Sequence, residues 1–270
     1  MTRIVCIGDC HFGPQGGRNA DRYAALDQII EHGLRLNHLG AWLFAGDLNH
    51  AKMTIEDRNA LAPRLQRMAE AAPILLIRGN HDLDGDPEIF TRLDTRWPIQ
   101  YVTTAQVVTL KLATLEQAAI FCLPYIFKAE LVSQGVAHGD LVQTVLGLLD
   151  PIFIDAAAKL QEHARNYDLP LMLGHLNIGG AIASTGQPSI SKEIELDSAL
   201  LARLGPIPKI FGHIHKHQAI HDAVYLGSIT RQDFGEREDK CFGVLTFAAD
   251  RSWSLNFEPL TVPAMHHVEG

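Results

Sequence analysis

The sequence has few cysteines and no excess of positive charge. Its four cysteines, Cys6, Cys10, Cys122 and Cys241, show no C-x-x-C spacing, which argues against a disulfide framework or a thiolate zinc site. The formal net charge of −8 at pH 7 excludes a protein that coats nucleic acid through bulk positive charge. A phosphate substrate stays compatible with this charge, because bound divalent cations reverse its sign locally.

The sequence also lacks an apolar run long enough for a transmembrane helix, so we expect no membrane association. Asp9 and His11 interrupt the N-terminal apolar run before it resembles a signal peptide. We therefore expect a cytoplasmic protein. The 270 residues, 47% of them apolar, contain no linker-like segment and predict a single domain over residues 1–270, with no separate capping domain.

Five short apolar runs each lead into glycine and a polar cluster. They are TRIVCI before GDCH, AWLFA before GDLNH, PILLI before RGNHD, LPLML before GHLN and IPKIF before GHIHKH. Nearly continuous apolar runs are typical of strands covered on both faces. Residues 19–38 and 54–72, which separate the first three runs, repeat apolar residues at helical spacing. Alternating strands and helices predict parallel βαβ units.

Local signals define the expected ends of these elements. Asn19 is a candidate cap for the first helix, and Thr54 with Asp57 forms a capping pattern for the second. Pro63 leaves the continuity of the second helix open, because proline removes a helical hydrogen bond. Residues 100–126 are rich in strand-forming runs, which predicts antiparallel strands.

The second half of the chain is predicted to contain helix, loop and hairpin. A helical stretch begins near Asp140 and is expected to stop where Asp150 and Pro151 cap a second helix. Residues 177–191 are rich in Gly, Ser, Thr and Pro and predict a long loop, a place where sites often occur. Residues 241–260 predict a hairpin that closes a sheet.

Candidate metal ligands follow all five apolar runs. Sites in open α/β sheets lie beyond the carboxyl ends of the strands, so the clusters converge if the strands share one sheet. Seven ligands exceed the needs of one tetrahedral ion and suit two ions that share a bridging carboxylate, for which we choose Asp47. Nitrogen and oxygen donors without a thiolate favour manganese, iron or zinc. The candidate ligands are Asp9, His11, Asp47, Asn80, His175, His213 and His215.

Each of these clusters also has a plain structural explanation. A lone histidine beside a strand, or a lone GD or GH dipeptide, is more often ordinary turn chemistry than a metal ligand. Five such clusters in one chain, each after an apolar run, make the metal site the stronger interpretation.

The ordered set D-x-H, GD, GNHD, GH and GHxH resembles the calcineurin-like metallophosphoesterase superfamily and spans residues 9–215. The resemblance implies an α/β fold of four layers, in which two packed mixed β-sheets are flanked by helices. It implies that His81 acts on the leaving oxygen and that Asp82 supports it. It also implies a first metal held by Asp9, His11, Asp47 and His215, and a second held by Asp47, Asn80, His175 and His213.

Three further stretches are similar to DNA repair nucleases of the SbcD type. They are GDLNH, GHIHKHQ and AVYLGSITRQDFGE. The first of them carries His50, whereas phosphoprotein phosphatases have an aspartate and an arginine after GD. This resemblance implies a manganese-dependent DNA exonuclease or endonuclease in which His50 and His81 flank the leaving group.

The last of these stretches supplies candidate substrate contacts. Gly227 would allow close approach of a phosphate, Ser228 would donate a hydrogen bond, and Arg231 and Lys216 would pair with neighbouring phosphates. For Arg231 a solvated loop charge is the plain alternative.

The partners and the substrate stay open at the level of sequence. Proteins of the SbcD type usually continue into a capping domain and a helical segment that binds an SbcC-type ATPase, whereas this sequence ends at Gly270. DNA, such an ATPase and a second copy of the chain are the candidate partners. A small-molecule phosphodiesterase acting on cyclic nucleotides or dinucleotides is the first alternative function. A non-catalytic scaffold is the second, and the intact ligand set argues against it.

Overall fold

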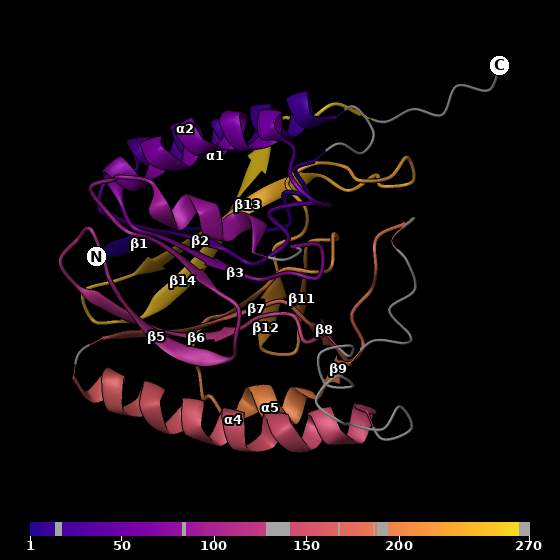
Figure 1. The fold of residues 1–270 in the computed structure, drawn as a ribbon. Helices are drawn as coiled ribbons and strands as arrows, with labels where there is room; N and C mark the ends of the chain where they lie inside the picture. Colours follow the sequence, from indigo (N-terminus) through magenta and orange to yellow (C-terminus); the bar gives the residue numbers. More distant parts are fainter. Residues whose placement is uncertain are drawn as a thin grey trace.

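The protein folds as two six-stranded sheets packed face to face, with helices over both outer faces (Figure 1). The computed structural model describes residues 1–13, 18–82, 85–127, 141–166, 168–185, 187 and 194–264. Helices α1 (Asn19–Arg35) and α2 (Ile55–Ala71) cover the first sheet, and α4 (Leu141–Arg165) and α5 (Ser198–Ala202) cover the second. The predicted four-layer α/β architecture is confirmed.

The first sheet has the strand order β14-β13-β1-β2-β3-β4. Its first four strands in the chain, β1 to β4, run parallel. The hairpin β13-β14 adds to β1 in antiparallel fashion, as the sequence predicts for the C-terminal segment. The strands are β1 (Thr2–Ile7), β2 (Leu39–Phe44), β3 (Ile74–Ile77), β4 (Ile99–Val102), β13 (Lys240–Phe247) and β14 (Trp253–Leu260).

The second sheet has the order β11-β12-β10-β7-β6-β5. Its four inner strands are parallel, and the two edge strands are antiparallel to their neighbours. The strands are β5 (Gln106–Lys111), β6 (Gln117–Leu123), β7 (Leu169–Gly174), β10 (Lys209–Phe211), β11 (Gln218–Ile220) and β12 (Ala223–Tyr225). A short parallel pair, β8 (Asn177–Ile178) and β9 (Glu195–Leu196), and a 3-10 helix, η2 (Asp86–Arg92), complete the described elements.

The five apolar runs are divided between the sheets: β1, β2 and β3 belong to the first sheet, whereas β7 and β10 belong to the second. One expectation about the strands is wrong. The run that begins at Gln100 is not part of an antiparallel set: β4 pairs in parallel with β3, and only β5 and β6 pair antiparallel. Sequence patterns predict strands but not their partners, which are set by long-range packing.

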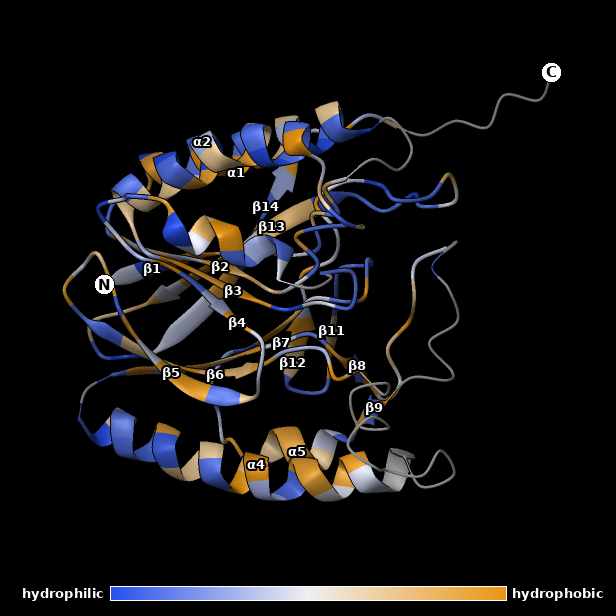
Figure 2. Cartoon of the chain, viewed as in Figure 1, coloured by the Kyte–Doolittle hydropathy of each residue, from blue (hydrophilic) through white to orange (hydrophobic). Residues whose placement is uncertain are grey.

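Both sheets are covered on both faces, which explains the continuous apolar runs. Along β1, Val5 and Ile7 pack toward α1 and α2, whereas Ile4 and Cys6 pack between the two sheets. A third apolar cluster lies between the second sheet and α4. Figure 2 shows the same pattern, with apolar residues on the sides of the helices that face the sheets.

The helix ends and interiors show two further differences from expectation. Arg18, not Asn19, occupies the N-cap of α1, and the Asn19 side chain instead accepts a hydrogen bond from Gly13 N (3.1 Å). Helix α4 is continuous through Pro151 and does not divide there. Buried residues on both sides of Pro151, such as Leu149 and Phe153, pack on the second sheet, and this packing outweighs the hydrogen bond that proline removes. Pro63 likewise lies inside a continuous α2.

Within the described residues, no helix has the length and apolar content needed to cross a membrane.

The predicted capping pattern of α2 is confirmed and supports a test of stability. Thr54 Oγ1 accepts from Asp57 N, and the Asp57 carboxylate accepts from Thr54 N, each at 3.1 Å. Replacing Thr54 with alanine leaves Asp57 N without its acceptor and should lower the free energy of unfolding by about 0.5–2 kcal/mol. Urea unfolding measures this loss, with Thr54→Ser as the matched control that keeps the hydroxyl. An alanine variant as stable as the serine variant would contradict the expectation.

Candidate metal centre

The two sheets end at a common edge, where the loops from both meet. After β1 of the first sheet, Asp9 Oδ1 accepts a hydrogen bond from the main-chain N of His213, which follows β10 of the second (2.8 Å). The loops after β1 and β2 are joined by hydrogen bonds from Cys10 N and His11 N to the carbonyl of Asp47 (2.9 and 3.0 Å). The polar clusters therefore converge, although their strands lie in different sheets.

The backbone at this edge is strained at three of the candidate ligands. His11, Asp47 and His213 have φ values of 54°, 49° and 88°, a region that residues with a side chain seldom adopt. Such strain persists only where the surrounding structure enforces it, and it is concentrated at functional sites.

Two glycines allow the close packing of these loops. A Cβ at Gly79 would collide with the carboxylate and the main-chain N of Asp47, and one at Gly46 would collide with the imidazole of His175. Gly46 also has a positive φ of 93°. Glycine is therefore required at positions 46 and 79, because a candidate ligand occupies the space where a side chain would begin.

Four of the candidate ligands, those assigned to the second metal ion, form the compact second ligand set. Asn80 Oδ1 lies 2.9 Å from His213 Nδ1 and 3.0 Å from His175 Nε2, and that Nε2 lies 3.4 Å from Asp47 Oδ2. Two donor atoms that each lie about 2.1 Å from one ion are about 3.0 Å apart at a right angle and about 3.4 Å apart at a tetrahedral angle. The spacing of these four side chains therefore fits a single divalent ion.

The other candidates, those assigned to the first metal ion, form the first ligand set together with Asp47. His11 Nε2 lies 2.9 Å from His215 Nε2 and 3.8 Å from Asp47 Oδ2. Asp9, Asp47 and His175 each place a ligand atom within 4.8 Å of one another. Asp9 Oδ2 is buried and has no hydrogen-bond partner among the described residues, which fits an oxygen reserved for a cation. The donor set thus fits two divalent ions on either side of Asp47.

The charges of this cluster are coupled. Burial opposes the charge of Asp47, but His175, His11 and His81 outweigh it and hold the pKa of that carboxyl well below its usual value. Burial also lowers the pKa of His175, and the carboxylates of Asp47 and Asp9 outweigh this effect and raise it to about 9. A divalent cation bound at this place would supply positive charge beside the carboxylates of Asp47 and Asp9.

The tautomer of His175 is fixed by its main-chain partner. Its Nδ1 lies 2.6 Å from the carbonyl oxygen of Ala45, and because a carbonyl only accepts, Nδ1 carries the hydrogen. Nε2 is then the nitrogen that faces Asp47 and Asn80. Metal-binding histidines are commonly oriented in this way by the hydrogen bond of the other ring nitrogen.

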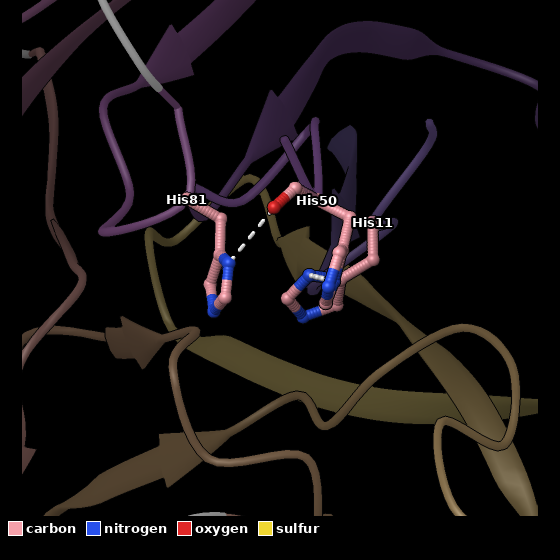
Figure 3. Close-up of side chains that lie close together, drawn as sticks. All are labelled: His11, His50 and His81. Carbon is pink, nitrogen blue, oxygen red and sulfur yellow. Dashed lines mark hydrogen bonds between the residues drawn. The ribbon is translucent and has the colours of Figure 1, made fainter. Parts of the chain in front are cut away.

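His81 and His50 form a pair beside the first set (Figure 3). The two rings stack with centroids 4.8 Å apart and an interplanar angle of 23°, and His81 Nδ1 donates to the carbonyl of His50 at 3.0 Å. His11 contacts both rings, with centroids 5.3 Å from His50 and 5.0 Å from His81. Burial, and to a smaller extent electrostatic repulsion from His81, lowers the pKa of His50 to about 4.

Asp82 joins the loops of two motifs. Its carboxylate is buried and accepts from Asn49 N (2.9 Å) and Gly79 N (2.8 Å). Burial and the neighbouring Asp47 raise the pKa of Asp82 to about 7. Asp82 thus supports the loops that carry His50 and His81.

The candidate substrate residues of the last motif make contacts within the chain. A Cβ at Gly227 would lie 2.8 Å from His217 N, Ser228 Oγ donates to Thr230 O (2.8 Å), and the Arg231 guanidinium donates to main-chain carbonyls, including Glu236 O at 3.2 Å. Lys216 is half-buried at the end of the loop that carries His215. A role of these residues toward substrate stays a prediction.

Two further side chains near the site are not among the residues predicted from the sequence. Tyr125, from the segment after β6, has its ring centroid 5.7 Å from that of His213 and 6.4 Å from that of His175. Glu236 lies with its carboxylate 3.7 Å from His215 Nδ1. Tyr125 follows a strand that carries no metal-ligand pattern. Glu236 ends the motif YLGSITRQDFGE, which could have drawn attention to it, but only its position in space indicates a role.

Two mixed sheets whose joined edge carries this set of histidines, carboxylates and an amide define a metal-dependent phosphoesterase. The family model for the calcineurin-like phosphoesterases matches residues 2–217, and the chain belongs to that family.

A similar solved structure is that of a putative 5'-nucleotidase from Staphylococcus aureus, determined in complex with alpha-ketoglutarate. It matches with a TM-score of 0.52 and 14% sequence identity. The match covers 99% of this chain and 56% of the other, so this chain spans just over half of that protein's length. At this identity the likeness shows the fold alone.

Proposed function

We propose that this protein is a two-metal phosphodiesterase that cleaves DNA, of the type represented by the SbcD nucleases. The observation that carries the proposal is the pairing of His50 with His81 beside the first ligand set. The motifs GDLNH, GHIHKHQ and YLGSITRQDFGE support the assignment to nucleases.

The His50–His81 pair suits a phosphodiester because a diester carries less negative charge than a monoester. A phosphate monoester carries close to two negative charges at neutral pH, and a guanidinium at the position of His50 would match it through charge-assisted hydrogen bonds. A phosphodiester carries only one charge. Two imidazoles at this place offer hydrogen bonds and a proton without a fixed positive charge, which suits the diester.

His81 is the residue that we assign to the leaving group. Its Nδ1 donates to the carbonyl of His50, so the protonated ring delivers a proton to the leaving oxygen from Nε2 and becomes neutral. His50 holds the ring of His81 by stacking and through its carbonyl. Two divalent ions, when bound, would supply polarisation of the phosphoryl group and activation of water. We also propose that the ions are Mn²⁺ and that the protein is located in the cytoplasm.

A second candidate function is that of a small-molecule phosphodiesterase acting on cyclic nucleotides or dinucleotides. It is favoured by the similarity of fold to a protein described as a putative 5'-nucleotidase and by the net charge of −8, which limits binding to long DNA.

Parallel assays with purified protein and Mn²⁺ separate these functions. End-labelled single-stranded and double-stranded DNA, cyclic AMP, and the chromogenic mono- and diesters of para-nitrophenyl phosphate serve as substrates. We expect the chromogenic diester to be hydrolysed with a kcat/KM at least about tenfold above that of the monoester, DNA to be cleaved, and single-stranded DNA to inhibit diester hydrolysis. Turnover of cyclic AMP with intact DNA would establish the second candidate instead. A preference for the monoester would contradict both.

A further inference from the structure

The motif YLGSITRQDFGE folds back over the loop that carries His215, and a buried lysine holds it there. Lys240, at the start of β13, donates to the Glu236 carboxylate at 2.6 Å, to Ser228 Oγ at 3.0 Å and to the main-chain carbonyl of His215 at 3.2 Å. Lys240 and Glu236 have only 2% and 1% of their side-chain surface exposed. The lysine thus connects a buried carboxylate directly to the loop of a candidate ligand.

Main-chain contacts fix the carboxylate in place. Gln232 N donates to Glu236 Oε2 at 3.1 Å, and Arg231 Nε donates to the carbonyl of Glu236 at 3.2 Å. Oε2 therefore has two donors, Gln232 N and Lys240 Nζ. Oε1, the other oxygen of the same carboxylate, is left to face His215.

Glu236 Oε1 and His215 Nδ1 are neighbours without partners. They lie 3.7 Å apart, which is beyond hydrogen-bonding distance, and in the described part of the chain neither atom has a hydrogen-bond partner. An unpaired buried acceptor opposite an unpaired buried ring nitrogen needs an explanation. For a hydrogen bond to form, the imidazole must turn toward Oε1 so that this separation shortens.

The remaining nitrogen of His215 points to the metal centre. Its Nε2 lies 2.9 Å from His11 Nε2, within the first ligand set. We propose that Glu236 is the positioning residue of His215: it accepts the Nδ1 hydrogen, holds the ring in the tautomer with a bare Nε2, and so prepares that atom for the first metal ion. A carboxylate in this position also makes the imidazole a stronger donor to a cation. The inference rests on the proposed metal site.

This role differs from that of a simple buried ion pair. A pair that served only the fold would be satisfied by Lys240 and Glu236 alone, and apolar residues of similar volume often replace such a pair with little loss of stability. Under both roles the fold survives the removal of both charges. Only the positioning role predicts that this removal changes the tautomer of His215.

The test combines the tautomer of His215 with the affinity for Mn²⁺. Histidine-labelled, metal-free full-length protein is studied by ¹H–¹⁵N NMR at about pH 8, where an ordinary imidazole is neutral, with His215→Gln to assign the resonances. We compare wild type with the double variant Glu236→Met, Lys240→Met, with the isosteric Glu236→Gln, and with Glu238→Gln as the matched control. Glu238 is a neighbouring carboxylate that lies 3.7 Å from Lys240 Nζ but bonds to Ser184, is 24% exposed and, in the part of the chain that the structure describes, forms no hydrogen bond or ion pair with His215.

Wild type is expected to carry the hydrogen on Nδ1 of His215, and the double variant to show a mixture of tautomers. The double variant should bind Mn²⁺ about 10 to 100-fold more weakly at one site, whereas Glu238→Gln should match wild type in both measurements. A hydrogen on Nε2 of His215 in wild type would overturn the inference, as would unchanged tautomer and affinity in the double variant.

If the double variant does not fold, Glu236→Gln decides. It should weaken Mn²⁺ binding more than Glu238→Gln does, and equal affinity in the two would overturn the role of Glu236. Wild-type protein that binds no Mn²⁺ would refute the proposed function, and the tautomer of His215 would still report on its contact with Glu236.

Discussion

Asp47→Ala is expected to abolish phosphodiester hydrolysis and to remove at least one of two bound ions. The Oδ2 atom of Asp47 faces both ligand sets, at 3.4 Å from His175 Nε2 and 3.8 Å from His11 Nε2. Its Oδ1 accepts from His81 N at 2.8 Å. One substitution therefore removes a shared ligand and also releases the loop that carries the proposed proton donor.

The measurement is elemental analysis after loading with manganese, together with hydrolysis of a chromogenic diester. Wild type should approach two ions per chain. Asp27→Ala is the control, because that carboxylate is 44% exposed and pairs with Arg64 on the surface. A wild type that holds one tetrahedral ion would refute the bridging role, and so would an Asp47→Ala variant that keeps both ions and its activity.

His81→Ala is expected to lower kcat by roughly two to four orders of magnitude, the usual contribution of a general acid, and to keep both metal ions. The reason is geometric. Its Nδ1 is held by the carbonyl of His50 and its ring by the stack on His50, whereas the two ligand sets are complete without it.

Metal content and kcat are therefore measured on the same preparation. His32→Ala is the control, because that ring lies on α1 and packs on Phe242 instead of the ligand sets. A general acid matters most for a poor leaving group, so the deficit of His81→Ala should be smaller with a para-nitrophenyl diester than with a dinucleotide. Loss of metal together with activity would place His81 among the ligands instead.

Local signals in the sequence were sufficient for the elements of the first sheet. The apolar runs predict β1, β2 and β3, because strands covered on both faces need apolar residues at every position. The pattern of Thr54 and Asp57 predicts the start of α2, since a capping box is made by residues three apart in sequence. Where local signals competed with packing they misled, as at Pro151, which lies inside α4.

The sequence by itself determined which residue types gather at the ends of the strands, and the family motifs assigned them as ligands. Only the tertiary structure decided how they meet. Whether β7 and β10 join the sheet of β1 or form another depends on contacts between residues far apart in the chain, and so does the position of Glu236 beside His215. The physical reason is the range of the interactions. A motif depends on the backbone conformation of a few neighbouring residues, whereas the distance between two loops is set by the packing of two sheets on a common core.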